Sequence, residues 1–364
     1  MAFHLPEYHA PDFTQPKFQN APDAKIVAAE MDGVAPDYYH STSMYPEYFK
    51  IDGKWLLAEE SRMDSSVILR EDGRLDVVEN RNIRRGDKVV LGRTENCEEG
   101  IYLHVSGFQE ESEAGDNFAF RAGRSRETAF SRDYDHLYEL LGYERDHGKV
   151  VWVMGPAFAF DYDARRAMQS LVENGFVHGL MAGNALATHD LEGGLLRTAL
   201  GQDIYTQRSQ PGGHYNHLDV INLVRRSGSI PKFVEDHNIQ DGIMYSLVKK
   251  NIPFVLTGSI RDDGPLPEVI GNAYEGQGRM RDMVRDATTV ICLATQLHTI
   301  ATSNMTPSFR VVDGVVRPLY IYCIDISEFV TNKLADRGSL SAISMVTNAQ
   351  DFIVNVAKGV GALK

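Results

Sequence analysis

The sequence is poor in cysteine and lacks the segments that mark secreted and membrane proteins. It has only three cysteines in 364 residues, Cys97, Cys292 and Cys323, and none of them belongs to a CxxC pair. This usage argues against a disulfide-stabilised scaffold and predicts buried thiols in a reducing compartment. No apolar run reaches the ~18 residues of a membrane-spanning helix, and no charged-then-apolar leader opens the chain. We therefore expect a cytoplasmic protein that does not bind a membrane.

Positive charge is also scarce. The 37 lysines and arginines face 50 aspartates and glutamates, so the formal net charge is −13 and the pI is about 5.4. Nucleic acid and anionic membrane surfaces repel such a chain, so neither is expected as a partner. The hydrophobic share of 43% is ordinary for a globular protein.

The common nucleotide-binding motifs are missing as well. No GxGxxG follows the first predicted strand of the α/β region, and the partial matches at Gly276 and Gly359 lack the strand or the βαβ unit that the motif needs. No GxxxxGK[ST] is present, which argues against a P-loop enzyme. A nucleotide site, if the chain has one, must be built differently.

The spacing of apolar residues divides the chain into three regions. Residues 1–40 show no period and predict an irregular N-terminal arm. Residues 41–125 contain short β-prone runs between turn pairs such as Asp52-Gly53 and Asp72-Gly73, which predict a small β-rich module on the substrate side. Residues 126–364 alternate fully apolar runs with amphipathic ones, which predicts an α/β domain with a parallel sheet covered on both faces.

Five predicted strands, over 150–154, 177–181, 254–257, 290–295 and 319–324, lead into small or polar residues. In an open parallel sheet, ligands bind at the carboxyl ends of the strands, so these residues predict one composite cofactor site. Open backbone N–H groups at such places can hold phosphates, although the glycines could also serve tight turns alone. The candidate residues are Gly155, Pro156, Gly183, Asn184, Gly258, Ser259, Ile260, Arg261, Thr295, His298, Ser303, Asn304, Asp325, Asp336, Arg337, Gly338 and Ser339.

Adjacent carboxylates at Asp262 and Asp263 are candidate catalytic groups. They can grip cationic groups of a ligand, or cap a helix and pair with Arg261. His189 and Asp190 are a second catalytic pair, because histidine titrates near neutrality, but a structural role is equally open.

Histidines elsewhere give weaker signals. His298 is a further candidate for proton transfer. His214 and His217 lie three residues apart, but no third ligand follows at a suitable spacing, so we predict no metal site.

These motifs carry a family resemblance. The segments "GNALATHDLE", "GGHYNHLDVINLVRRSGSI", "PFVLTGSIRDDGPLPEVI" and "LATQLHTIATSNM" resemble the NAD-dependent, archaeal-type ornithine cyclodeaminase family, over about residues 40–360. The same module forms the C-terminal part of bifunctional arginine dihydrolase/ornithine cyclodeaminases. The chain departs from the family pattern in three places: Ser303 stands where the family has glycine, "HDLEGGLLRTALG" stands where the family has "HDIEKALYGTSLG", and "VTNKLADRG" carries an extra residue between Thr331 and Lys333.

The resemblance implies a fold and a reaction. The large domain is expected to resemble the NAD-binding domain of deoxyhypusine synthase. The implied enzyme is an ammonia lyase of arginine and ornithine metabolism and proline biosynthesis, which converts L-ornithine to L-proline. NAD accepts the Cα hydride, the δ-amine attacks the imine, ammonia departs, and NADH reduces the cyclic imine. Asp262 or Asp263 would bind the terminal ammonium, and Arg261 or a basic residue of the β-module the α-carboxylate.

The resemblance also implies a homo-oligomer, a dimer or a tetramer. Because the β-module begins within the first 50 residues, we expect no preceding dihydrolase domain and free ornithine as the substrate. Other readings stay open: an NAD-dependent cyclodeaminase or dehydrogenase for lysine or a related basic amino acid, or an NAD-binding module without turnover. A transfer reaction like that of deoxyhypusine synthase needs a Schiff-base lysine, and Lys333 is the one lysine among these junctions.

Overall fold

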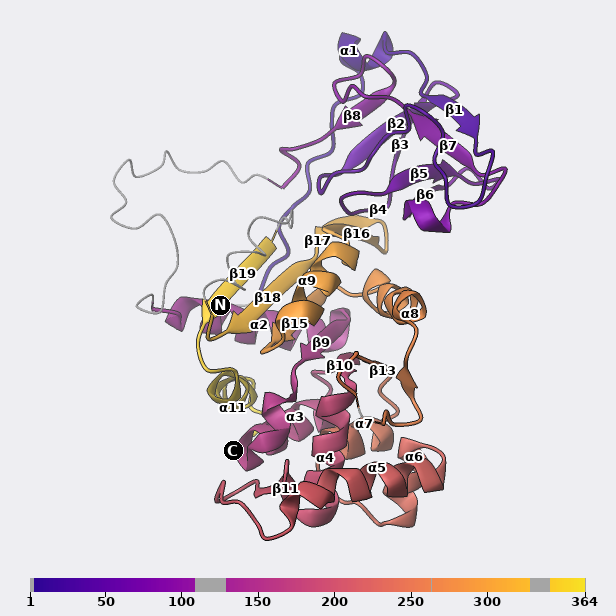
Figure 1. Ribbon diagram of the computed structural model, residues 1–364. Helices are drawn as coiled ribbons and strands as arrows, with labels where there is room; N and C mark the ends of the chain where they lie inside the picture. The colour runs from indigo at the N-terminus through magenta and orange to yellow at the C-terminus, as the bar shows by residue number, and fades with distance from the viewer. Residues whose placement is uncertain (1–2, 109–128, 263, 328–340, 364) are drawn as a thin grey trace.

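Two regions of different architecture make up the computed structural model, which describes residues 3–108, 129–262, 264–327 and 341–363. In Figure 1 a β-rich module lies at the top, a parallel sheet lies in the middle, and a layer of helices lies below the sheet. This arrangement confirms the predicted α/β fold with an additional β-rich N-terminal region.

The β-module is built from two antiparallel sheets. One has the strand order β1 (Lys25–Ala28), β7 (Lys88–Leu91), β5 (Ser66–Leu69) and β6 (Leu75–Val78), and the other has the order β3 (Lys54–Leu57), β2 (Glu47–Ile51) and β8 (Ile101–Leu103). The β2–β3 turn places Asp52 and Gly53 at φ values of 49° and 76°, as a two-residue hairpin turn requires. Phe49, Val67 and Ile101 are fully buried between the sheets.

Part of the segment predicted as an irregular arm has regular structure. It contains the short helix α1 (Pro16–Gln19) and strand β1, which pairs with β7. Phe3 packs its ring against Tyr320 of the α/β region, and the Tyr8 hydroxyl lies 2.9 Å from the Tyr48 hydroxyl in the β-module. The segment therefore contacts both regions, and the boundaries of the three predicted regions stay a prediction.

Seven parallel strands form the central sheet. Their order is β14 (Val269–Ile270), β13 (Phe254–Thr257), β10 (Gly179–Gly183), β9 (Val150–Met154), β15 (Thr289–Leu293), β18 (Tyr320–Asp325) and β19 (Ser341–Val346). The chain runs outward from β9 in one direction and then returns to build the other half from β15. The carboxyl ends of β9 and β15 therefore flank the topological switch point, where open α/β sheets bind ligands.

Both faces of this sheet are buried. Trp152 and Tyr322 point into the larger core, which is covered by α2 (Ser131–His147), α3 (Tyr162–Glu173) and α11 (Ala349–Gly359). Val151 and Cys292 point to the opposite face, under α8 (Ala273–Arg285) and α9 (Gln296–Met305). Burial on both sides explains why the strands are continuous apolar runs in the sequence.

Between β10 and β13 the chain forms the helical layer α4 (Asn184–Leu196), α5 (Asn216–Ser227), α6 (Ile230–Asp236) and α7 (Ile243–Lys249), with the short strands β11 (Thr198–Ala199) and β12 (Gln202–Asp203) (Figure 1). α4 follows β10 directly and is buried along most of its length. Its residues are therefore placed by contacts with neighbouring elements rather than by solvent.

A small sheet joins the two regions. The hairpin β16 (Phe309–Val312) and β17 (Val315–Pro318) precedes β18, and β16 pairs with β4 (Glu60–Ser61) of the β-module. Next to it, the α8 residue Arg281 contacts Glu60 at 3.0 Å and Glu79 at 3.5 Å. These buried contacts fix the β-module against the sheet face that carries α8 and α9.

The predicted strands differ from the observed ones in detail. β10 begins two residues after the predicted start at 177, and β15 ends at Leu293 rather than at 295. Strands β14 and β19 and the β16–β17 hairpin were not predicted. None of the helices in the described ranges has the length and apolar character that a bilayer crossing requires.

Candidate functional site

The switch point is built around a glycine. Gly155 follows β9, and its N–H donates to the Leu293 carbonyl at the end of β15 over 2.9 Å. A Cβ added to Gly155 would lie 2.0 Å from the Ala294 carbonyl oxygen, so no other residue fits this approach. Pro156 then begins the short 3-10 helix η2 (Pro156–Phe160), and Ala294 adopts the left-handed region with φ of 49°. The predicted residues Gly155, Pro156 and Thr295 thus lie together.

The end of β10 supplies the next part of the site. Gly183 precedes α4, and a Cβ there would lie 3.2 Å from the His298 ring, so the two junctions are adjacent. Asn184 begins α4 and is buried. Its side-chain oxygen accepts hydrogen bonds from the Leu266 N–H at 3.1 Å and from the Thr188 hydroxyl at 3.4 Å. Asn184 therefore fastens the loop after β13 to the sheet edge.

His298 lies in the first turn of α9. Its Nε2 is 3.3 Å from the Thr257 hydroxyl at the end of β13. Burial lowers the pKa of His298 below its ordinary value, because the imidazolium loses hydration there. The neutral ring can donate or accept one hydrogen bond at the edge, and it brings the ends of β13 and β15 together with Gly183.

The loop after β13 is shaped by Asp262. Its carboxylate accepts the Ser259 N–H at 2.7 Å, and the Ser259 hydroxyl accepts the Arg261 N–H at 3.1 Å. Gly258 donates its N–H to the Ile270 carbonyl of β14, and Ile260 is fully exposed. These contacts favour a loop-shaping role for Asp262, so the catalytic role stays a prediction.

Of the remaining predicted cofactor residues, Asp325 lies at the same sheet edge, because the preceding Ile324 carbonyl accepts the Ala294 N–H at 3.1 Å; the others lie further along α9 or beyond the described residues. Ser303 and Asn304 lie two turns along α9, ~12 Å from Thr295 by helical rise. There the Asn304 carbonyl accepts a hydrogen bond from Arg62 of the β-module. Asp325 ends β18 and accepts the Ser327 N–H at 2.9 Å. Asp263, Asp336, Arg337, Gly338 and Ser339, like Lys333, lie outside the described residues.

His189 and Asp190 are adjacent in sequence, but their side chains contact different helices. The Asp190 carboxylate is 1% exposed and lies 2.8 Å from Arg165 Nε. It also accepts the backbone N–H groups of Ile243 at 3.0 Å and Met244 at 2.7 Å, at the start of α7. Asp190 therefore joins α4, α3 and α7, and these contacts favour a structural role over the predicted catalytic one.

His189 instead pairs with Glu192. Its Nδ1 lies 3.0 Å from Glu192 Oε2, and its ring lies 5.4 Å from that of Phe160, the last residue of η2. The His217 ring from α5 lies 5.8 Å away. Phe160 ends the short helix that begins at the switch point, so His189 lies one short element away from the predicted cofactor edge.

Glu192 is the site residue that the sequence reasoning missed. Its carboxylate is fully buried and also accepts the Thr198 hydroxyl at 2.8 Å and the Gly201 N–H at 3.0 Å. Burial alone would raise the pKa of Glu192, but the hydrogen bonds from His189, Gly201 and Thr198 outweigh it and hold the pKa below its ordinary value. The three-residue spacing of His189 and Glu192 on a helix was the available signal.

The histidines at 214 and 217 do not form a metal site in the described part of the chain. His214 is exposed and stacks on Tyr215 at 4.1 Å, whereas His217 faces His189. Among the described residues, no three His, Cys, Asp or Glu side chains are placed to hold an ion.

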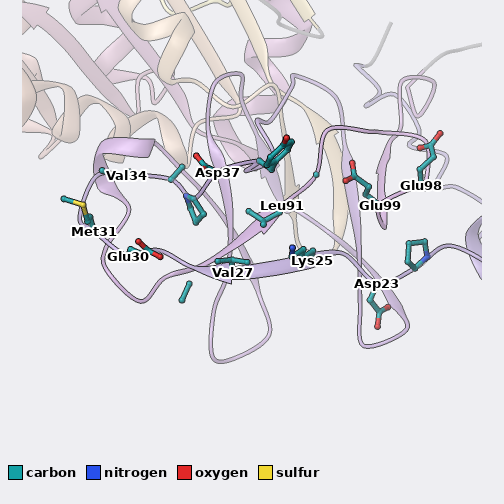
Figure 2. A pocket seen from close by; sticks show the side chains of 16 residues that line it. Asp23, Lys25, Val27, Glu30, Met31, Val34, Asp37, Leu91, Glu98 and Glu99 are labelled. Carbon is teal, nitrogen blue, oxygen red and sulfur yellow. The ribbon is translucent and has the colours of Figure 1, made fainter.

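A groove of about 770 Å³ lies on the β-module, away from the strand ends (Figure 2). Val27 of β1 and Leu91 of β7 lie on its floor, and Met31, Glu98 and Glu99 are among its walls. The residues that line this groove lie between Pro22 and Glu99, and none of them is a predicted site residue. We therefore place the candidate site at the sheet edge, where the chemically useful side chains converge.

The fold and the edge geometry define a class: a doubly wound α/β protein whose switch point has the form of a dinucleotide site. The family model described as "Arginine dihydrolase ArgZ-like, C-terminal, Rossmann fold" matches residues 137–356. Ornithine cyclodeaminase from Methanocaldococcus jannaschii is 38% identical over 339 residues, covering 91% of this chain and 76% of the relative. The chain belongs to the archaeal-type ornithine cyclodeaminase family, as the sequence motifs predict.

Solved structures agree with this assignment. The crystal structure of a conserved LOR/SDH protein from Methanococcus maripaludis S2 superposes with a TM-score of 0.84 and covers 93% of this chain and 98% of that one. The two sequences are 33% identical. The ternary complex of AgrE with ornithine and NAD⁺ is 32% identical with a TM-score of 0.59, and it covers 94% of this chain and 46% of AgrE. This chain thus spans about half of that bifunctional enzyme, and the predicted NAD cofactor agrees with the complex.

Proposed function

We propose that this protein is an ornithine cyclodeaminase that converts L-ornithine to L-proline and ammonia, with NAD as a transient hydride acceptor. One observation carries the proposal: the chain aligns over 94% of its length with AgrE, whose crystal structure holds ornithine and NAD⁺. The named archaeal relatives support the same reaction, at 38% and 37% identity.

The residues at the switch point fit a dinucleotide. The helices α4 and α9 both begin at this edge, neither carries an acidic residue in its first turn, and neither has a side-chain N-cap hydrogen bond in the described structure. Their first N–H groups and helix dipoles therefore favour an anion such as a pyrophosphate. We propose that Gly155, Gly183 and Thr295 line this part of the cofactor site.

Bound NAD supplies the hydride acceptor that amine oxidation needs. The residues of the chain position the substrate and transfer protons. We propose that His189 is the general base that removes a proton from the substrate ammonium, because the Glu192 carboxylate accepts from Nδ1–H and leaves Nε2 as the basic nitrogen. Neutral His298 would donate or accept at the sheet edge, and Asn184 and Asp262 would hold the loop after β13 in shape.

Assembly and location belong to the same proposal. We propose a homo-oligomer, a dimer or a tetramer, since closed homo-oligomers are the common form of such enzymes. Light scattering that gave the monomer mass of 40.7 kDa at all working concentrations would contradict it. A cytoplasmic location is supported by three cysteines that are all buried free thiols.

The decisive experiment is a screen of basic amino acids with NAD⁺, in which ammonia, proline and NADH are measured together. With L-ornithine, ammonia and proline should appear in equal amounts, and NADH should not exceed the concentration of enzyme. Cα-deuterated ornithine should return its label to the same carbon of proline. Steady release of NADH would instead indicate a dehydrogenase, and ammonia from lysine but not from ornithine would indicate the homologous cyclodeaminase.

Cofactor binding is tested separately by thermal shift, because a ligand that binds only the native state stabilises it by mass action. NAD⁺ should raise the melting temperature of the wild type. Gly155→Ala should remove this shift, since the added Cβ would meet the Ala294 carbonyl. Gly271→Ala is the matched control, because a Cβ there meets nothing within 4 Å. Equal shifts in both variants would contradict the proposed site.

A further inference from the structure

The His189 ring is held between side chains of α4 and α5. On its own helix lies Glu192, with Nδ1 and Oε2 3.0 Å apart. From α5 comes His217, whose Nδ1 is buried and has no hydrogen-bond partner in the described structure. On the other side of α4, Arg165 lies 2.8 Å from Asp190 and 3.2 Å from Asp241, so these charges pair with one another. In the described part of the chain, Glu192 is the charged side chain that the imidazole contacts directly.

Glu192 is unusually well held for a residue that only has to accept one proton donor. Oε1 accepts the Thr198 hydroxyl and the Gly201 N–H, and Oε2 accepts the Leu200 N–H at 3.0 Å beside the His189 contact. The turn after α4 thus fixes the carboxylate, and the carboxylate fixes the ring. A carboxylate behind a histidine selects its tautomer, orients it and stabilises the imidazolium, as in other carboxylate–histidine pairs.

We infer that Glu192 is a positioning residue of the proposed reaction: it holds His189 with its proton on Nδ1 and its basic Nε2 directed away from the helix. The inference rests on the proposed function for the identity of the step, and on the contacts above for the geometry. When His189 takes a proton, the charge forms on Nε2–H while Nδ1–H stays bonded to Glu192. Glu192 itself stays ionised throughout.

The test uses the full chain and the variant Glu192→Gln. The amide keeps the size and can still accept from the turn, but it removes the charge and can donate to Nδ1, which would leave the wrong tautomer. We expect kcat to fall at least about tenfold with little change in the KM for NAD⁺. The split between kcat and KM separates the two roles, because a misoriented general base slows proton transfer without weakening cofactor binding.

Thr198→Val is the matched control. It removes one hydrogen bond from the same carboxylate and loosens the same turn, but it leaves the contact between Glu192 and His189. We expect a lower melting temperature and a kcat close to that of the wild type. If both variants lowered kcat alike, or if Glu192→Gln kept the wild-type kcat, Glu192 would serve only the turn and the inference would be wrong.

A second readout does not depend on turnover. The ring nitrogens of His189, assigned by the absence of their signals in His189→Asn, are observed by nitrogen NMR in the wild type and in Glu192→Gln. In the wild type the neutral ring should carry its proton on Nδ1, beside the Glu192 carboxylate, and in the variant this preference should be lost. If the wild type turned over no basic amino acid but this difference appeared, the proposed function would fail and the positioning would stand. Glu192→Asp, which keeps the charge on a shorter side chain, replaces Glu192→Gln should that variant not fold, and should show a weaker preference for Nδ1–H than the wild type. A wild type whose neutral ring carried its proton on Nε2 would overturn the inference.

Discussion

The two sides of α4 use buried carboxylates in opposite ways. On one side Asp190 pairs with Arg165 and accepts two N–H groups at the start of α7, contacts that favour a structural role. On the other side Glu192 faces a histidine that can gain and lose a proton. A carboxylate paired with a permanent cation holds elements together, whereas one paired with a titratable ring can act on its protonation. The partner, not the burial, separates the two roles.

The largest loss of stability is expected at Asp190. Asp190→Ala should cost about 3 kcal/mol of unfolding free energy, because it removes the buried carboxylate from the Arg165 guanidinium and leaves only the part-exposed Asp241 at 3.2 Å. The measurement is urea denaturation. Asp236→Ala is the control, since its ion pair with Lys232 is exposed to solvent and should contribute little to stability. A stable Asp190→Ala protein without turnover would favour the catalytic role instead.

At His189 we expect a loss of activity rather than a loss of stability. His189→Asn should lower kcat by about 100-fold, the lower end of what a general base contributes, while unfolding free energy changes little. Steady-state kinetics and denaturation on the same sample check both parts. The control is His214→Asn, which alters an exposed ring on a nearby segment. Wild-type kcat in His189→Asn would remove the general base from the proposal.

A smaller effect is expected at Asp262. Asp262→Asn keeps an oxygen that can accept the Ser259 N–H, so the loss of unfolding free energy should be about 1 kcal/mol or less. If the carboxylate only shapes the loop, kcat should stay within about threefold of the wild type. A larger loss of kcat in a folded variant would support the catalytic role that the sequence suggests.

The sequence could predict those features that depend on residues close together in the chain. Strands β9, β13 and β18 were predicted from their apolar runs, because burial on both faces leaves a local pattern. The β16–β17 hairpin also left a local signal, Asp313-Gly314 at φ values of 50° and 81°, which was overlooked. The contacts of Asp190 left no local signal in the sequence, because Arg165 lies 25 residues away and Ile243 lies 53 residues away. The side chains of adjacent residues on a helix point about 100° apart, so His189 and Asp190 are neighbours in sequence but contact different residues.

The smallest expected effect concerns the pH dependence of stability, and it tests how the contacts of Glu192 act on its charge. The folded state lowers the pKa of Glu192, so the stabilisation is present above the unfolded pKa of about 4.3 and is lost as pH falls through the folded value. In Glu192→Gln this contribution is absent. The unfolding free energy of the wild type should therefore fall more steeply than that of the variant as the pH is lowered from about 5 to about 3. The measurement is a denaturant titration at each pH. Parallel curves for the two proteins would show that the hydrogen bonds from His189, Thr198 and Gly201 do not favour the charged carboxylate, which would also weaken its proposed hold on His189.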